Sequence, residues 1–443
     1  MEYLKKVDPQ MNEILEKETE RQETTLMMIP SENHTSQAVK EVVGSIFQDK
    51  YCEGYPYKRY YQGQEYYNQL EELCQDRVKK AFGVPFVNVQ PLSGSPANCA
   101  VYFGVLEPGD KMMGLRLDQG GHITHGLDIN FSGKFYENIF YNVNEEGQID
   151  YDAMEEMALK EHPKIIIAGI TSHPMALDFA RFSQIAEKCG AYLMADIAHV
   201  SGLILAGVYP NPVPYVHIIT TTTHKTLRGP RGALIMVTDK GMTKDPDLPN
   251  KINKAVFPGL QGGPHENNIA GIAVAVKEAM SPAFKEYGKQ VIKNAAILAE
   301  RLKEKGATLC SGGTNTHLIM MDLRSFDILG NTAAEALESS GIVVNKNCVP
   351  DDSNPPFYPS GLRFGAPGIT SRGMKEEEMV IIADCMIRVL SDISRIRKEM
   401  RVTFDQEKKL ATRKQMIEKS DVVKKVREEV RDLCSKFPLK KEY

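Results

Sequence analysis

Thr220-Thr221-Thr222-Thr223-His224-Lys225-Thr226-Leu227-Arg228-Gly229-Pro230-Arg231-Gly232 is the stretch from which both fold and chemistry follow most directly. The four threonines are β-branched, so they restrict the backbone and favour a strand. Gly229 and Pro230 favour a turn directly afterwards. The sequence therefore predicts a rigid strand that ends at Lys225 and directs one amine to one place.

Similar strand-like runs lie on either side of this stretch and alternate with helical patterns. They span 164–170, 192–196, 217–222 and 233–237. This alternation is typical of a mostly parallel sheet with helices on both faces, so we expect an α/β fold. In such sheets ligands bind beyond the carboxyl ends of the strands, and that is where Lys225 falls.

The sequence from about residue 280 onward is rich in helical patterns. A small sheet is suggested there by 316–323 and 341–344. We expect three parts: an N-terminal helical arm (1–25), a large domain (26–279) and a smaller α+β domain (280–443) that carries Arg363.

Asp196 ends the apolar run Ala191–Ala195. A carboxylate there is desolvated, which is tolerable if it faces a cation such as a protonated pyridine nitrogen. The alternative for an aspartate seen alone is a helix N-cap. The nearby His199 and the lysine downstream favour the first interpretation.

Two loops could complete a cofactor site. Ser93-Gly94-Ser95 precedes the apolar run 97–106, so a helix beginning here would offer free N–H groups to a phosphate, although such a serine is also a common cap. In Gly120-Gly121-His122-Ile123-Thr124-His125-Gly126, a flat imidazole could stack on a ring, although a histidine in such a loop often serves no function. We favour His122 over His125 for stacking.

A reactive lysine, an acid, a phosphate loop and a flat partner are what a pyridoxal phosphate enzyme requires. The chain resembles the serine hydroxymethyltransferase family over nearly its whole length. The matching stretches include Ser31-Glu32-Asn33, Lys50-Tyr51-Cys52-Glu53-Gly54-Tyr55-Pro56, Lys58-Arg59-Tyr60-Tyr61, Asp196-Ile197-Ala198-His199, Phe257-Pro258-Gly259-Leu260-Gln261-Gly262-Gly263-Pro264, Asn345-Lys346-Asn347 and Ser360-Gly361-Leu362-Arg363.

The resemblance implies a fold-type I pyridoxal phosphate enzyme, with a seven-stranded, mostly parallel sheet in its large domain. It would transfer the hydroxymethyl carbon of serine reversibly to tetrahydrofolate, giving glycine and 5,10-methylenetetrahydrofolate. Pyridoxal 5'-phosphate would be the cofactor, tetrahydrofolate the co-substrate, and no metal is expected. An obligate homodimer with shared active sites, or a tetramer, is also implied.

The resemblance also implies roles for individual residues. Catalysis would depend on Lys225, Glu53, His122, Asp196, His199, Tyr61 and Thr222. Cofactor contacts would come from Ser93, Gly94, Ser95, His122, Asp196, His199, His224 and Lys225, and from Gly262 and Gly263 of the partner subunit. Substrate contacts would come from Ser31, Tyr51, Glu53, Tyr61, Arg231 and Arg363, and folate contacts from Glu53, Tyr60, Leu117, Gly121, Ile123 and Asn347.

Three of these roles have a clear chemical reason. Lys225 would form the Schiff base with the cofactor. The Arg363 guanidinium would clamp the substrate carboxylate at two points, which a lysine could not do. The Glu53 carboxyl would donate or accept a proton during one-carbon transfer, and in the family its segment, with Tyr51 and Tyr61, completes the neighbouring subunit's site.

Two other functions stay open from the sequence. One is a related aldolase for threonine or other β-hydroxy amino acids, or an α-methylserine hydroxymethyltransferase. Departures from the family pattern near the site, such as Tyr57, Gln64 and His173, keep it open. The other is a binding protein of this fold without catalysis, which the intact lysine, acid and arginine disfavour.

Composition sets further limits. The 443 residues carry a net charge of −4, which gives no indication of a nucleic-acid surface. The eight cysteines include no C-x-x-C pair, so reduced thiols in a cytoplasmic protein are expected. The charged first 25 residues lack the apolar core of a signal peptide, and no run reaches the roughly 18 apolar residues of a membrane span.

Overall fold

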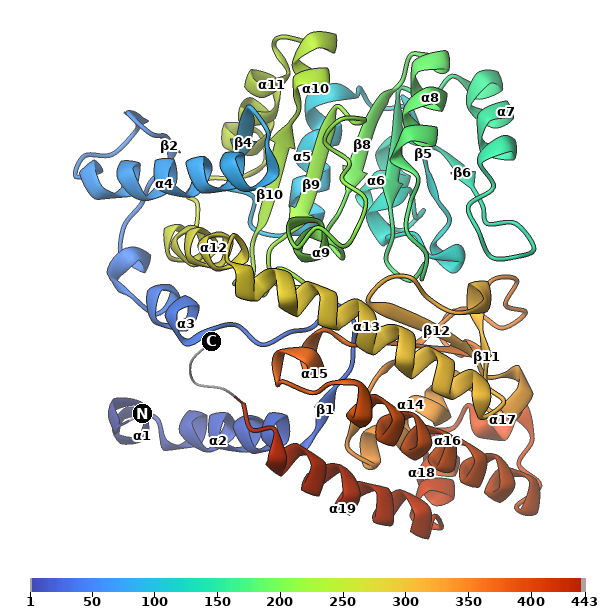
Figure 1. Ribbon diagram of the computed structural model, residues 1–443. Coiled ribbons are helices and arrows are strands. Elements are labelled where there is room, and N and C mark those ends of the chain that lie inside the picture. The colour runs from blue at the N-terminus through green and yellow to red at the C-terminus, as the bar shows by residue number, and fades with distance from the viewer. Residues whose placement is uncertain (1, 440–443) are drawn as a thin grey trace. The chain divides into compact units, whose positions relative to one another are not determined.

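A computed structural model describes residues 2–439 of the chain (Figure 1). It divides into two compact units. The large unit consists of Asn33–Ile292 and Thr314–His317. The C-terminal unit consists of the residues up to Glu32, Lys293–Gly313 and the residues from Leu318 onward.

The large unit is built on a seven-stranded sheet of order β4-β10-β9-β8-β7-β5-β6. The strands from β9 to β6 run parallel, whereas β10 runs antiparallel to both of its neighbours. The expected mostly parallel seven-stranded sheet is confirmed. Its strands are β4 (Phe86–Asn88), β5 (Lys111–Leu115), β6 (Glu137–Tyr141), β7 (Ile165–Gly169), β8 (Tyr192–Asp196), β9 (Ile218–Thr222) and β10 (Ala233–Val237).

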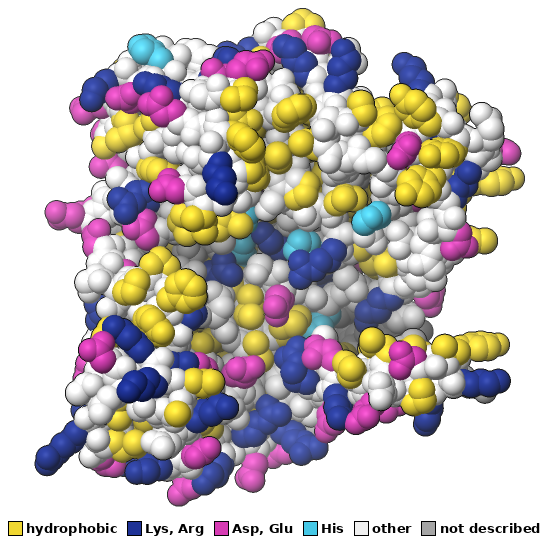
Figure 2. All heavy atoms as spheres, turned by 180° about the vertical axis from the view of Figure 1, so that it is seen from behind, with side chains coloured by type: hydrophobic (Ala, Val, Ile, Leu, Met, Phe, Trp, Pro, Cys, Tyr) yellow, Lys and Arg dark blue, Asp and Glu magenta, His cyan; other side chains and the backbone are white. Residues whose placement is uncertain are grey.

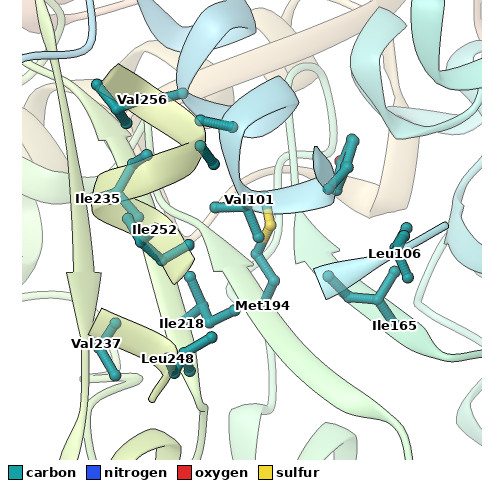
Figure 3. Packing of buried hydrophobic residues seen from close by; sticks show 14 of the residues in the cluster. Val101, Leu106, Ile165, Met194, Ile218, Ile235, Val237, Leu248, Ile252 and Val256 are labelled. Atoms are coloured by element: carbon teal, nitrogen blue, oxygen red, sulfur yellow. The ribbon is translucent and has the colours of Figure 1, made fainter. Parts of the chain in front are cut away.

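Both faces of this sheet are buried. Alternate residues of each strand point to opposite faces, and side chains on both faces are covered by helices. Ile165, Ile167, Ile235 and Val237 join one core cluster with helices α5 (Gly94–Val105) and α11 (Leu248–Lys254) (Figure 3). Residues that point to the other face, such as Ile166, are also fully buried, and α8 (Phe179–Cys189) packs against β7 and β8. Figure 1 shows helices on both faces, as in a doubly wound α/β fold.

Helices of the large unit start and stop at ordinary signals. Helix α8, for example, begins after Asp178, whose side chain accepts a hydrogen bond from the Arg181 N–H, and ends at the left-handed Gly190. The helices are α3 (Gln37–Val43), η1 (Ile46–Gln48), α4 (Glu65–Phe82), α5 (Gly94–Val105), η2 (Leu117–Gln119), η3 (Ile123–His125), α6 (Phe131–Phe135), α7 (Tyr151–Glu161), α8 (Phe179–Cys189), α9 (Ser201–Leu205), α10 (Asp239–Lys244), α11 (Leu248–Lys254), η4 (Ala255–Leu260) and α12 (Glu266–Ala279). A small hairpin pairs β2 (Gly54–Tyr55) with β3 (Lys58–Arg59).

The C-terminal unit holds an antiparallel sheet of order β11-β12-β15-β14 and a parallel pair, β1 with β13. Its strands are β1 (Leu26–Met27), β11 (Thr308–Leu309), β12 (Leu318–Asp322), β13 (Ile342–Val343), β14 (Asn345–Asn347) and β15 (Gly361–Gly365). Its helices are α1 (Glu2–Val7), α2 (Pro9–Thr24), η5 (Cys310–Gly312), η6 (Arg324–Phe326), α14 (Gly330–Ser339), α15 (Pro367–Ser371), α16 (Glu376–Glu399), α17 (Phe404–Glu407), α18 (Leu410–Glu418) and α19 (Asp421–Lys436).

One expectation for the small sheet is wrong. The segments 316–323 and 341–344 were expected to share it, but only the first contributes, as β12. Ile342 and Val343 instead pair with Leu26 and Met27 of the N-terminal segment. Such pairing across more than 300 residues leaves no local signal in the sequence.

The compact units group the chain differently from the expected parts 1–25, 26–279 and 280–443. Helix α13 (Pro282–Glu304) runs through the division at residue 292, and α2 packs against α19. The buried Arg372 guanidinium donates to the carbonyls of Thr25 and Cys434, joining both ends of the C-terminal unit. The three-part division stays a prediction, of which residues 1 and 440–443 lie outside the described residues.

Surface charges of both signs are intermixed with apolar side chains on the face drawn in Figure 2. In residues 2–439, no helix has both the length and the apolar character needed to cross a membrane. No disulfide joins the cysteines of the described residues.

Candidate active site

Lys225 lies in the turn that follows β9, and its side chain is buried. Two groups hold the backbone of this turn: the Asn33 amide and the Arg228 N–H both donate to the Lys225 carbonyl, at 3.0 and 3.1 Å. Arg228 itself has a left-handed φ of 60° and lies with its guanidinium 4.3 Å from the Tyr287 ring centre. The strand expected to end at Lys225 ends at Thr222 instead, and these contacts hold the turn that carries the lysine.

Asp196 ends the neighbouring strand β8, whose backbone pairs with β9 at Thr220. Its carboxylate accepts hydrogen bonds from the Asn98 amide (2.8 Å) and the Ala198 N–H (3.1 Å), and lies 3.1 Å from His125 Nε2. Burial opposes ionisation of this group, but the contacts with His125 and Asn98 outweigh it and hold the pKa of Asp196 well below its usual range. Asp196 is therefore a fixed negative charge.

His125 is a candidate site residue that the sequence did not single out. It is buried against Asp196, whereas His122 is partly exposed and has its Nδ1 2.7 Å from the Thr124 hydroxyl. Their ligand atoms and the Asp196 carboxylate lie within 4.8 Å of one another, a grouping suited to a cationic N–H or a metal ion. Two histidines three residues apart were the available signal, but only one was expected to act.

Gly169 is a second residue that the sequence analysis missed. It ends β7 beside Asp196, and a Cβ there would lie 2.7 Å from His125 Cε1 and 2.8 Å from Asp196 Cβ. A larger residue would displace the histidine or the acid. A glycine at the end of an apolar strand was the signal, since glycine there often marks a close approach.

Helix α5 begins at Gly94, next to the turn that carries the lysine. Ser93 stands at the N-cap in an extended conformation, but its side chain makes no capping hydrogen bond. A Cβ on Gly94 would lie 2.7 Å from Thr222 Cγ2, so the helix start sits directly against β9. Ser93, Gly94 and Ser95 thus form an uncapped helix N-terminus, which favours an anion.

His224 lies beside Lys225 and has a buried Nδ1 atom with no hydrogen-bond partner among the described residues. Burial, and then the charges of Lys225 and Arg231, lower the pKa of His224 to about 3. Arg231 Nη1 lies 3.4 Å from its other ring nitrogen. A neutral imidazole with one unused nitrogen is suited to contact a ligand at this place.

His199 is buried close to the same strand ends. Its Nδ1 lies 3.3 Å from His317 Nε2, and its carbonyl accepts from the Thr226 hydroxyl. The Thr222 hydroxyl donates to the Ala198 carbonyl at 3.3 Å. His317 follows His199 by 118 residues, so no local pattern in the sequence indicates this pair.

Leu117, Gly121 and Ile123 lie in or next to the Gly-Gly-His loop. The Ile123 side chain is exposed. A Cβ on Gly121 would lie 1.9 Å from the Leu115 carbonyl oxygen, so this position requires glycine.

A separate cluster gathers the residues that the resemblance assigned to the partner's site. Tyr51 and Tyr61 have ring centres 5.7 Å apart and are 64% and 46% exposed. A Cβ on Gly262 would lie 3.1 Å from Glu53 Oε1, and one on Gly263 would lie 3.0 Å from Tyr51 Cδ1. Tyr60, exposed as well, packs on Phe257. We call Tyr51, Glu53, Tyr60, Tyr61, Gly262 and Gly263 the tyrosine cluster.

Ser31, Asn347 and Arg363 belong to the C-terminal unit. The Arg363 guanidinium is buried on β15 and donates from Nε to the Asn345 amide oxygen at 3.0 Å. Burial lowers the pKa of Arg363 to about 10, while the charge of Glu32 acts in the opposite direction. The Asn347 amide donates to the Cys348 carbonyl.

The residues of the large unit fit pyridoxal phosphate. A permanent carboxylate suits a protonated pyridine nitrogen, the uncapped start of α5 and the unused His224 nitrogen suit a phosphate, and the buried lysine suits its aldehyde. The close Gly94–Thr222 and Gly169–Asp196 approaches keep these groups together at the ends of the strands.

Comparison with known proteins gives the same identification. The family model described as serine hydroxymethyltransferase matches residues 4–386. A curated protein named serine hydroxymethyltransferase, from Desulfotalea psychrophila, is 47% identical over 438 residues, which cover 99% of this chain and 96% of that protein. Neither match favours the alternative functions left open by the sequence. The chain therefore belongs to the serine hydroxymethyltransferase family, and it is a fold-type I, pyridoxal phosphate-dependent enzyme that transfers a one-carbon unit between serine and tetrahydrofolate.

Proposed function

We propose that Lys225, Asp196 and the start of α5 are the centre of this enzyme's active site. The observation that carries the proposal is the buried carboxylate of Asp196, which His125 and Asn98 keep ionised beside the lysine-bearing turn. When bound, pyridoxal phosphate supplies a carbonyl carbon that amines attack and a ring that withdraws electrons from a bond at the substrate Cα.

The site residues of the large unit have proposed roles in that chemistry. Asp196 holds a proton on the ring nitrogen, and His122 packs on the ring face. The backbone at Ser93, Gly94 and Ser95, together with His224, holds the phosphate. Lys225 binds the aldehyde and releases it when the substrate amine arrives, while His199 and Thr222 bound the ring edge.

Substrate binding is proposed to rest on arginine. The planar Arg363 guanidinium matches a carboxylate at two points, and its burial strengthens that pairing. Ser31 assists it, and Arg231, beside His224, is a second substrate contact. Glu53 exchanges the proton that moves as the one-carbon unit is transferred, with Tyr51 and Tyr61 beside it.

Folate is proposed to lie against Leu117, Gly121 and Ile123 of the Gly-Gly-His loop and against Glu53, Tyr60 and Asn347. The exposed Ile123 and Tyr60 side chains support this, because a flat pterin needs apolar and aromatic surface.

We further propose a homodimer, or a tetramer of two such dimers, in the cytoplasm. The tyrosine cluster supports the dimer: exposed aromatic residues gathered at one place favour an interface, and Gly262 and Gly263 lie with Glu53 and Tyr51 in one chain. All of these residues would then reach the partner's site together. Reduced cysteines are consistent with the cytoplasm.

The absorbance of the purified protein tests the proposal. A band at about 420 nm is expected for bound cofactor, with a new longer-wavelength band when glycine and tetrahydrofolate are both added. Lys225→Ala should lose the lysine-dependent band and multiple turnover. A Lys225→Ala protein that turned over repeatedly at near-parental rate would overturn the assignment. A band that glycine changes but folate does not would point to an aldolase.

A further inference from the structure

The backbone that carries Glu53 is held from the inside of the large unit. The Arg59 Nη1 atom donates to the carbonyls on both sides of Glu53, those of Cys52 (2.7 Å) and Gly54 (3.1 Å). The Glu53 carbonyl itself accepts from the Tyr60 N–H at 3.1 Å. These bonds hold the backbone on both sides of Glu53 and do not involve its side chain.

Arg59 is in turn held by buried partners. Its Nη2 lies 2.7 Å from Glu71 Oε2 on α4, and its Nε donates to the Asn68 amide oxygen. The Gln90 amide donates to both Glu71 oxygens and to the Gly54 carbonyl, so it ties the same backbone to the same acid. The Arg59 side chain is only 3% exposed, so water does not compete for these bonds.

A second acid lies in this cluster without a hydrogen bond. Both carboxyl oxygens of Glu266, the first residue of α12, are buried and have no partner among the described residues. Its Oε1 atom lies 3.6 Å from Arg59 Nη1, the nitrogen that donates to the two carbonyls around Glu53. A charged Glu266 would compete with those carbonyls for one nitrogen.

We infer that Arg59 is a positioning residue for Glu53, and that Glu266 must be uncharged for Arg59 to keep that position. The inference rests on the role proposed above for Glu53 in folate-dependent transfer. Through Arg59, this role would also depend on the buried Glu71 of α4 and Glu266 of α12.

The electrostatic environment agrees with this arrangement. Burial, and then the nearby charge of Glu71, raise the pKa of Glu266 to about 8, while Arg59 and the Cys52 thiol act in the opposite direction. Burial raises the pKa of Glu71 too, but the ion pair with Arg59 and the Gln90 hydrogen bonds oppose it, so Glu71 is the acid we assign as ionised. Among the described residues, Cys74 and Tyr67 also interact electrostatically with Glu266.

A double-mutant cycle on the holoenzyme tests the positioning role. Arg59→Lys keeps the charge but cannot reach two carbonyls and Glu71 together, so folate-dependent formation of glycine should fall about 10- to 100-fold. Adding Arg59→Lys to Glu53→Gln should cost no more than about twofold beyond Glu53→Gln alone, because both changes disable one group. Cofactor affinity should change by no more than about twofold in any of the three variants.

The outcomes separate this inference from the function it rests on. If Glu53→Gln keeps parental activity, the role proposed for Glu53 fails. The inference is overturned if Glu53→Gln is impaired and the effects of the two substitutions multiply in the double variant. It is also overturned if Arg59→Lys weakens cofactor binding as much as it lowers folate-dependent turnover, because Arg59 would then have a general structural role. Should Arg59→Lys not fold, Gln90→Met removes the other donor to the Gly54 carbonyl and should show the same lack of additivity with Glu53→Gln.

The pH profile tests the Glu266 part. In the parent enzyme, kcat/KM for tetrahydrofolate should fall as the pH rises through about 8, when Glu266 ionises. Glu266→Gln should match the parent at pH 7 and lose that alkaline fall. Glu65→Gln makes the same charge change at the exposed start of α4 and should leave the fall in place. An alkaline fall unchanged in Glu266→Gln would contradict this part.

Discussion

At the scale of single residues, two buried carboxylates in one unit take opposite charge states. Asp196 accepts bonds from Asn98 and Ala198 and contacts His125, so its ionised form is stabilised despite burial. Glu266 is more fully buried, and this burial together with the charge of Glu71 stabilises its neutral form. For Asp196 the hydrogen bonds outweigh burial, whereas for Glu266 burial and the neighbouring charge of Glu71 outweigh the attraction of Arg59.

Removing the charge of Asp196 should therefore affect the chemistry more than the fold. Asp196→Asn keeps the shape but loses a charge-assisted bond to the ring nitrogen, which is worth roughly 2 kcal/mol, so kcat should fall at least about 30-fold. Steady-state kinetics at saturating serine and cofactor measure it. Asp128→Asn makes the same change at an exposed position and serves as the control. Parental kcat in Asp196→Asn would show that this acid does not face the ring.

Glu266 should make stability depend on pH. Its pKa is about 8 in the folded protein and about 4.3 in an unfolded chain, so between these values the unfolded state releases a proton that the folded state keeps. Stability is therefore greatest below about pH 4.3 as far as this group is concerned, and it falls as the pH rises to about 8. Glu266→Gln removes this dependence and should be more stable than the parent at pH 8 by a few kcal/mol.

Chemical denaturation at pH 5, 6.5 and 8 measures the difference, which should grow with pH. A constant difference at the three values would mean that Glu266 is already ionised in the folded protein at pH 5.

At the scale of elements, the site depends on how closely α5 approaches β9. Gly94→Ala would place a Cβ 2.7 Å from Thr222 Cγ2 and push the helix start away from the strand. Alanine favours helices, so the helix itself should not suffer. Because the phosphate is proposed to bind at this helix start, cofactor affinity should fall about tenfold or more, as measured by titration of the apoenzyme.

Two variants make this prediction specific. Gly104→Ala lies on the same helix, where the new Cβ would be 3.4 Å from its nearest neighbour, and it should bind cofactor normally. Thr222→Ser keeps the hydroxyl but removes the methyl group that the new Cβ would meet, so it should restore affinity to Gly94→Ala. Failure of this rescue would count against the steric explanation.

The sequence could predict features that depend on neighbouring residues, but not those that depend on contacts between distant parts of the chain. The strands at 192–196 and 233–237 were predicted with their observed bounds, because apolar runs bounded by turn residues are local signals. The roles of His125 and His317 were not predicted, since each depends on contact with a residue 71 or 118 positions away. The pairing of β1 with β13 was missed for the same reason, as was the unbonded carboxyl of Glu266, which only the packing of α12 reveals.

At the level of the whole molecule, the site residues fall into two groups, so two inactive variants should be able to complement each other in a mixed dimer. Lys225 and Asp196 lie at the strand ends, whereas Glu53 lies in the tyrosine cluster with Gly262 and Gly263. If that cluster serves the partner subunit, a dimer of one Lys225→Ala chain and one Glu53→Gln chain contains one site with both defects and one site with neither.

Unfolding, mixing and refolding these two inactive variants in equal amounts should therefore restore activity. Half of the dimers would be mixed, and each would hold one intact site of two, so about a quarter of the parental activity is expected. Lys225→Ala mixed with Asp196→Asn is the matched control: both defects lie in the same half of the site, so neither site of the mixed dimer is intact and nothing should be regained. If the first pair recovers no more than the control while size measurements show mixed dimers, Glu53 acts within its own chain and the shared site is wrong.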